Sequence, residues 1–191
     1  MLPRGMEKSL TYSEVDDAYL FKKQWVRTKD IYHEIIAQIK KTVDPDCRYQ
    51  EMPSGINPAV QVSVHMLFYL VTYFYCRFCF LSPYNRPVLA MLHTYEGKAD
   101  LTMSVAKDVY LGCPNRDLLM KKASYLSTVC GFPLTVEEGS QTVTFRFSLI
   151  PEKKHPLFTF SALAFAHVDR IVEAAVSAAK TDGKNSAPRI F

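Results

Sequence analysis

The cysteines are the first residues of this sequence whose type and spacing could support chemistry. Cys76 and Cys79 form a C-x-x-C pair, the spacing found in zinc ribbons and in redox-active thiol pairs. The pair lies inside an apolar run, and neither a second C-x-x-C nor a histidine at ligand spacing accompanies it. The chain has five cysteines, an odd number, and no signal peptide precedes them. We therefore expect reduced, buried thiols in a cytoplasmic protein rather than a disulfide framework or a metal site.

The histidines form no recognisable catalytic order. His65, His93, His155 and His167 are scattered, with no Ser-His-Asp or Cys-His arrangement around them. The sequence also contains no P-loop, no G-x-G-x-x-G and no H-E-x-x-H. These patterns predict neither a catalytic residue nor a metal site.

Composition and charge describe an ordinary globular chain. Apolar residues make up 48% and charged residues 22% of the 191 residues, which is enough for one domain, residues 1–191, with a sizeable core. The net charge of +4 arises from basic residues that occur in pairs, such as Lys40 and Lys41, and not in a long basic run. We expect these pairs to be solvated and expect no nucleic-acid partner.

The elements that must position any site follow from the apolar spacing. A leader (1–13) is followed by an N-terminal helix (14–41) with apolar residues at helical intervals. The core (47–151) carries alternating strands, clearest at Val143, Phe145, Phe147 and Leu149, and a C-terminal helix (157–180) precedes a tail (181–191). Within the core we expect strands at 47–53, 88–96, 100–107, 132–138 and 142–150, and helices at 58–81 and 115–131. This order predicts an α+β fold: a mixed β-sheet with helices packed on one face, plus one N-terminal and one C-terminal helix.

The stretch VHMLFYLVTYFYCRFCF, residues 64–80, is nearly all apolar or aromatic. Its length alone permits a membrane span. His65, Thr72 and Arg77 would be costly in lipid, and aromatic residues occur throughout the stretch and not only at its ends. We therefore expect the central buried helix of the domain, with no transmembrane span. We expect Arg77, near the end of that helix, to reach solvent or a carboxylate.

Residues 47–151 resemble the ATP-binding domain of histidine kinases and their relatives, the GHKL superfamily. The order strand, helix, strand, strand, helix, strand, strand is similar, and VCGFPLTVEEGSQTVTFRFSLIP is close to the end of such domains. In DVYLG, Asp108 and Gly112 stand where the outer members of the family's D-x-G-x-G stand. The resemblance implies an α/β sandwich, and it makes Asp108 and Gly112 weak candidates for nucleotide contacts. Asp108 could equally turn the chain after a strand.

The sequence departs from this family at three parts of the nucleotide site. Tyr69 and Tyr73 stand where the family's N-box helix carries asparagines, one of which binds Mg²⁺, and a phenol is a poor magnesium ligand. Tyr110 replaces the first glycine of D-x-G-x-G, so these three tyrosines are candidates to line or fill the cleft. Almost nothing separates Gly112 from the helix that begins near Asn115, where the family has a glycine-rich lid. We interpret this as a fold kept and an ATP site largely lost.

His33 is followed by Glu34, a pair similar to the His-acid pair of a phosphoacceptor helix. A true acceptor helix belongs to a helical hairpin that dimerises into a four-helix bundle. One N-terminal helix is available here, which favours an exposed structural histidine.

Three functions remain open. The first is a non-catalytic signalling or regulatory module, without a cofactor, that binds another signalling protein or a kinase partner domain in a bacterial two-component pathway. The second is a divergent but active ATP-binding domain of a sensor histidine kinase, which would use ATP with Mg²⁺. The third is a small-ligand domain that uses the degenerate cleft. Fold analogy alone does not decide among them, and a homodimer is compatible with each.

Overall fold

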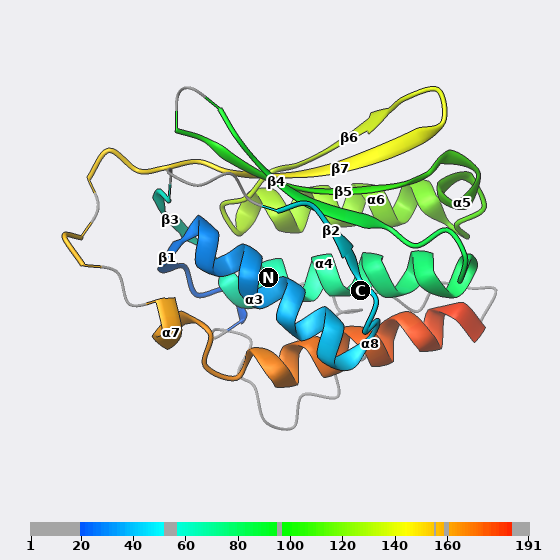
Figure 1. Cartoon of the computed structure of the whole chain (residues 1–191), viewed down its shortest axis with the longest axis horizontal. Coiled ribbons are helices and arrows are strands. Elements are labelled where there is room, and N and C mark those ends of the chain that lie inside the picture. The colour runs from blue at the N-terminus through cyan, green and yellow to red at the C-terminus, as the bar shows by residue number, and fades with distance from the viewer. Residues whose placement is uncertain (1–19, 52–56, 95–96, 155, 159–160, 185–191) are drawn as a thin grey trace.

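A computed structural model describes residues 20–51, 57–94, 97–154, 156–158 and 161–184. The elements are arranged in layers: a β-sheet, then helices α4 (Val64–Leu81) and α6 (Arg116–Val129) beneath it, then α8 (Val168–Lys184) on the far side of α4 (Figure 1). Helix α3 (Thr28–Thr42) contacts the sheet directly, because the Tyr32 hydroxyl donates a hydrogen bond to the carbonyl oxygen of Leu89 at 3.2 Å. The predicted fold class, an α+β fold with a mixed sheet and helices packed on one face, is confirmed. The leader at 1–13 lies outside the described residues.

The main sheet has five strands in the order β2-β4-β5-β7-β6. The first pair, β2 (Arg48–Tyr49) and β4 (Val88–His93), is parallel, and the other neighbours are antiparallel. The remaining strands are β5 (Ala99–Ala106), β6 (Leu134–Glu138) and β7 (Thr142–Leu149). The predicted alternation sets the buried face, because side chains at every second position of a strand point to one side. On β5 and β7 this face carries Leu101, Met103, Val105, Val143, Phe145, Phe147 and Leu149.

The predicted N-terminal helix was wrong at residues 24–27. Residues Gln24–Arg27 form strand β1, which pairs antiparallel with β3 (Ala59–Val62), and helix α3 spans Thr28–Thr42. Residues 14–19 lie outside the described part of the chain. Val26 is fully buried opposite Val60, so a pairing between distant segments overrides the local helical spacing.

The predicted helix at 58–81 also begins later than expected. The residues expected to form its first turn instead form strand β3, in which Val60 and Val62 are buried on either side of exposed Gln61. This two-residue period is that of a strand. Helix α4 then spans Val64–Leu81, and Pro58 does not open it: the Pro58 carbonyl instead accepts a hydrogen bond from the Thr28 amide.

Helix α4 is buried on all sides, since every residue from Val64 to Phe78 is buried. Its Phe74 packs against Phe145 of β7, with ring centroids 5.2 Å apart. The opposite face contacts α8, and no other pair of described elements makes more extensive contact. This placement explains why the helix has no polar stripe. By length and composition alone α4 could cross a membrane. In the described part of the chain, however, 83% of its residues are buried.

The predicted C-terminal helix at 157–180 is broken in two. Helix α7 spans Ser161–Ala164 and α8 spans Val168–Lys184. Between them His167 adopts φ 63°, a left-handed conformation that interrupts a helix. Helix α8 continues into the predicted tail as far as residue 184, and residues 185–191 lie outside the described part.

Candidate functional site

The two tyrosines that stand at the N-box positions lie under α8. Tyr69 and Tyr73 are one helical turn apart on α4, and their rings are stacked with centroids 6.3 Å apart. They are 1% and 0% exposed, and the Tyr73 hydroxyl donates a hydrogen bond to Oδ2 of Asp182 in α8 at 2.9 Å. Burial, reinforced by the Asp182 charge, raises the pKa of Tyr73. These rings therefore fill a packed helix-helix interface.

Tyr110 lies elsewhere, on the short helix α5 (Lys107–Leu111). Its ring meets Phe145 of β7 edge-on at 5.9 Å, and the guanidinium of Arg116 lies over it at 5.1 Å. Arg116 is the first residue of α6 (Arg116–Val129). Tyr110 thus packs against the sheet, whereas Tyr69 and Tyr73 pack beneath α8.

Asp108 and Gly112 are brought together by the backbone of α5. The Gly112 amide donates to the Asp108 carbonyl at 3.0 Å, and the Asp108 carboxylate accepts from the Val109 amide at 2.9 Å. Gly112 has φ −76°, so no left-handed conformation requires glycine there. Asp108 is exposed, and the contacts described here make it a turn-forming residue.

Arg77 contradicts our expectation that its guanidinium would reach solvent or a carboxylate. It is 2% exposed, and its Nε and Nη1 have no hydrogen-bond partner. No carboxylate among the described residues forms an ion pair with it. Its charge lies close to the buried Cys113 thiol, whose pKa is raised by burial and partly lowered again by Arg77. Nothing in the sequence predicts this burial, because arginine side chains are mostly exposed.

The thiols of the C-x-x-C pair lie on α4. Burial raises the pKa of both Cys76 and Cys79 to about 12. A nucleophilic or metal-binding thiol has a lowered pKa, so the shift at these two thiols is opposite to that of a reactive or metal-binding cysteine. In the part of the chain that the structure describes, no three His, Cys, Asp or Glu side chains gather as a metal site.

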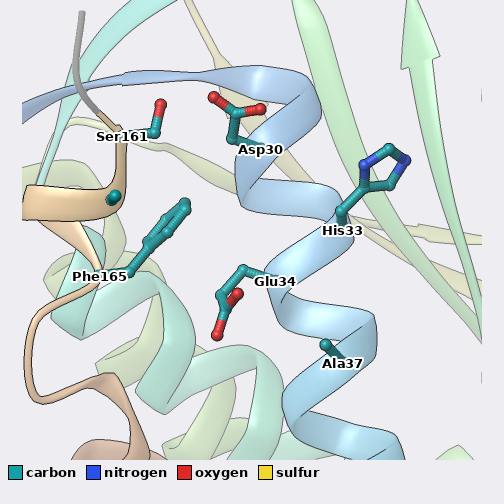
Figure 2. A pocket seen from close by; sticks show the side chains of 7 residues that line it. Asp30, His33, Glu34, Ala37, Ser161 and Phe165 are labelled. Carbon is teal, nitrogen blue, oxygen red and sulfur yellow. The ribbon is translucent and has the colours of Figure 1, made fainter.

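His33 borders a surface groove between α3 and α7. The groove encloses about 610 Å³ and is lined by Asp30, His33, Glu34, Ala37, Ser161, Ala162 and Phe165. Figure 2 shows the His33 ring pointing away from Glu34, although the two residues are adjacent in sequence. The Glu34 carboxylate instead accepts a hydrogen bond from Nε2 of Gln38 at 2.9 Å. Sequence reasoning singled out His33 and missed the groove, because its second wall comes from a segment more than a hundred residues away.

No family model matches this sequence, and no curated protein matches it. A search of solved structures found similarity to a mycobacterial sensor histidine kinase, MprB, with a TM-score of 0.46 and 12% sequence identity. The match covers 68% of this chain and 99% of that chain. A likeness of this degree does not place the chain in the kinase family, and no residue role follows from it.

Proposed function

We propose that this chain is a non-catalytic signalling or regulatory module that acts by binding another protein. The observation that carries the proposal is the burial of Tyr69 and Tyr73 beneath α8. In the family that the sequence resembles, these positions carry the asparagines that serve the metal and the triphosphate. A stacked pair of buried phenols under a packed helix offers poor magnesium ligands and leaves little room for phosphates.

Calorimetry tests this proposal directly. The chain is titrated with ATP in millimolar Mg²⁺, and no heat of binding is expected up to millimolar nucleotide. Clear binding in the micromolar range would overturn the proposal. A parallel titration with ADP distinguishes a general adenine pocket from a triphosphate site, because the two nucleotides differ only in the γ-phosphate.

The exposure of His33 favours a second candidate, a divergent ATP-binding domain that transfers phosphate to this residue or to a partner. Its Mg²⁺–ATP would have to bind without the N-box asparagines. Incubation with γ-labelled ATP, followed by the same experiment on His33→Gln, tests it. Label that appears on the wild-type chain and disappears in the variant would support the kinase and exclude the non-catalytic module.

A cytoplasmic place in a bacterial two-component pathway is part of the same proposal. It is supported by the sequence resemblance, together with reduced, buried thiols such as Cys76. The partner would then be another signalling protein or a kinase domain. Co-purification from cells that carry the tagged full chain, with identification of the bound protein, tests this placement.

A further inference from the structure

The groove between α3 and α7 has chemistry that the proposed non-catalytic role leaves unexplained. One wall is α3, which presents Asp30 and Glu34, and the other is α7 with the residue that follows it, Phe165 (Figure 2). The lining is mainly apolar, and the groove is open to solvent. Leu163, 74% exposed on α7, adds apolar surface on the same short helix. An open, elongated apolar surface suits a peptide segment better than an enclosed small molecule.

Among the residues that the structure describes, the two carboxylates of the α3 wall have no cationic partner. Neither Asp30 nor Glu34 forms an ion pair with any described residue. Arg27, the nearest arginine in sequence, directs its guanidinium to the Asn57 carbonyl oxygen at 3.1 Å. Both acidic side chains are half-buried, so their charges are less well hydrated than those of a fully exposed face.

Helix stabilisation accounts for only one of these two charges. Asp30 lies in the first turn of α3, where a negative charge interacts favourably with the helix dipole. Glu34 lies beyond that turn, where the effect has decayed. Its contact with the neutral Gln38 amide does not compensate the charge. A basic side chain that enters the groove would compensate both carboxylates.

We propose that this groove docks a basic, amphipathic segment of a partner protein. A Lys or Arg of the segment lies between Asp30 and Glu34, and an apolar residue of the segment packs on Phe165. We choose this occupant by charge complementarity, because the groove is acidic and a basic segment is attracted to it. The chain as a whole carries a net charge of +4, so this attraction is confined to the groove. The inference rests on the proposed function, since it names the surface through which the module binds its partner.

Two matched peptides test the proposal by fluorescence anisotropy at 150 mM salt. One is a 12-residue amphipathic peptide with leucines on one helical face and lysines on the other, and the second carries glutamate in place of each lysine. The basic peptide is expected to bind at least tenfold more tightly than the acidic one. The isosteric double variant Asp30→Asn with Glu34→Gln is expected to weaken its binding at least tenfold. Asp117→Asn, a carboxylate 94% exposed on α6, is the control and should change the affinity less than twofold.

Equal binding of the two peptides, or basic-peptide binding that the double variant leaves unchanged, overturns the proposal. Self-association of the wild-type chain in sedimentation that the double variant abolishes also overturns it, because a second copy would then occupy the groove. Repeating the titration with saturating ATP and Mg²⁺ separates this inference from the proposed function. If calorimetry shows nucleotide binding while peptide docking is unchanged, the non-catalytic role is wrong and the docking proposal stands.

Discussion

The hydroxyl of Tyr73 donates a buried hydrogen bond to the carboxylate of Asp182 across 109 positions of sequence. The contact joins α4 to α8, and the two residues are 0% and 6% exposed. A hydrogen bond to a charged group typically contributes about 1.5–3 kcal/mol, more than a neutral one. The pair therefore provides a direct test of how firmly α8 is held over the stripe of tyrosines on α4.

We expect Tyr73→Phe to lower the free energy of unfolding by about 1.5–3 kcal/mol, because it removes the donor and keeps the ring. Urea denaturation measures the loss, and a double-mutant cycle with Asp182→Asn should return a coupling energy above about 0.5 kcal/mol. Tyr125→Phe, whose ring is 61% exposed on α6, is the matched control and should be near neutral. A cost for Tyr73→Phe equal to that of the control would mean that α8 does not depend on this contact.

Replacing Arg77 by methionine should stabilise the protein. The guanidinium is buried beside Cys113 without an ion pair to any described carboxylate, and unsatisfied buried donors cost about 1–3 kcal/mol. Methionine keeps much of the side-chain volume and removes those donors. Chemical denaturation should show a gain of about 1–3 kcal/mol.

The matched control is Arg86→Met, which should do the opposite. Arg86 Nη1 lies 2.6 Å from Oδ1 of Asp44, a carboxylate whose side chain is only 5% exposed. Removing the arginine leaves that carboxylate buried without its cation. A loss of stability in both arginine variants would indicate that Arg77 has a favourable charge partner after all.

His65 makes the stability depend on pH. Its side chain is fully buried, and Nε2 lies 2.7 Å from the Ala166 carbonyl oxygen, which can only accept a hydrogen bond. Burial lowers the pKa of His65 below the 6.5 of a free histidine. Below pH 6.5, His65 is protonated in the unfolded chain but stays neutral in the folded chain until its lower pKa is reached. The stability contributed by neutral His65 is therefore fully present above pH 6.5 and decreases as the pH falls.

Thermal unfolding at pH 7.5 and pH 5.5 tests this expectation. The decrease in melting temperature between the two should be smaller in His65→Gln than in the wild-type chain, because glutamine keeps a donor and does not titrate. His33→Gln, a replacement on the exposed face of α3, should leave the decrease unchanged. An identical pH response in His65→Gln would assign the effect to other groups, among which His93 also has a pKa lowered by burial.

The cysteines should resist modification in the folded chain. Burial raises the pKa of Cys76 and Cys79 to about 12 and that of Cys130 to about 11, so the reactive thiolate is scarce at pH 8. Dithionitrobenzoate should react slowly with the native protein and rapidly with all five thiols in guanidinium. A rapid native phase that disappears in Cys79→Ser would restore a redox role for the half-buried member of the pair.

The longest strands of the main sheet, β5 and β7, were predictable because each carries its alternating pattern locally. Val143, Phe145 and Phe147 alternate with polar residues, and all three are fully buried. Strands β1 and β3 were missed because each is only four residues long and its pairing partner lies far away in the sequence. Each is defined by the other, through pairs such as Val26 with Val60.

The candidate site was predictable only in part. Burial of Tyr69 and Tyr73 followed from the apolar run, but Asp182, the hydrogen-bond partner of Tyr73, falls in the segment expected to be a tail. Figure 2 places Ser161 and Phe165 opposite α3, and this neighbourhood depends on a chain path that no local pattern encodes. Arg77 shows the limit of rules based on residue type, because an average preference for the surface does not fix one side chain.

The burial of α4 between the sheet and α8 has a consequence during synthesis. Helix α4 ends at Leu81, whereas α8 begins at Val168, so its covering helix is translated much later. At typical rates of about 5–20 residues per second, this delay is on the order of ten seconds. Throughout that interval the nascent chain exposes an aromatic segment with the length and composition of a membrane anchor. Newly made chains would therefore be substrates for ribosome-associated chaperones, and the emergence of α8 would release them.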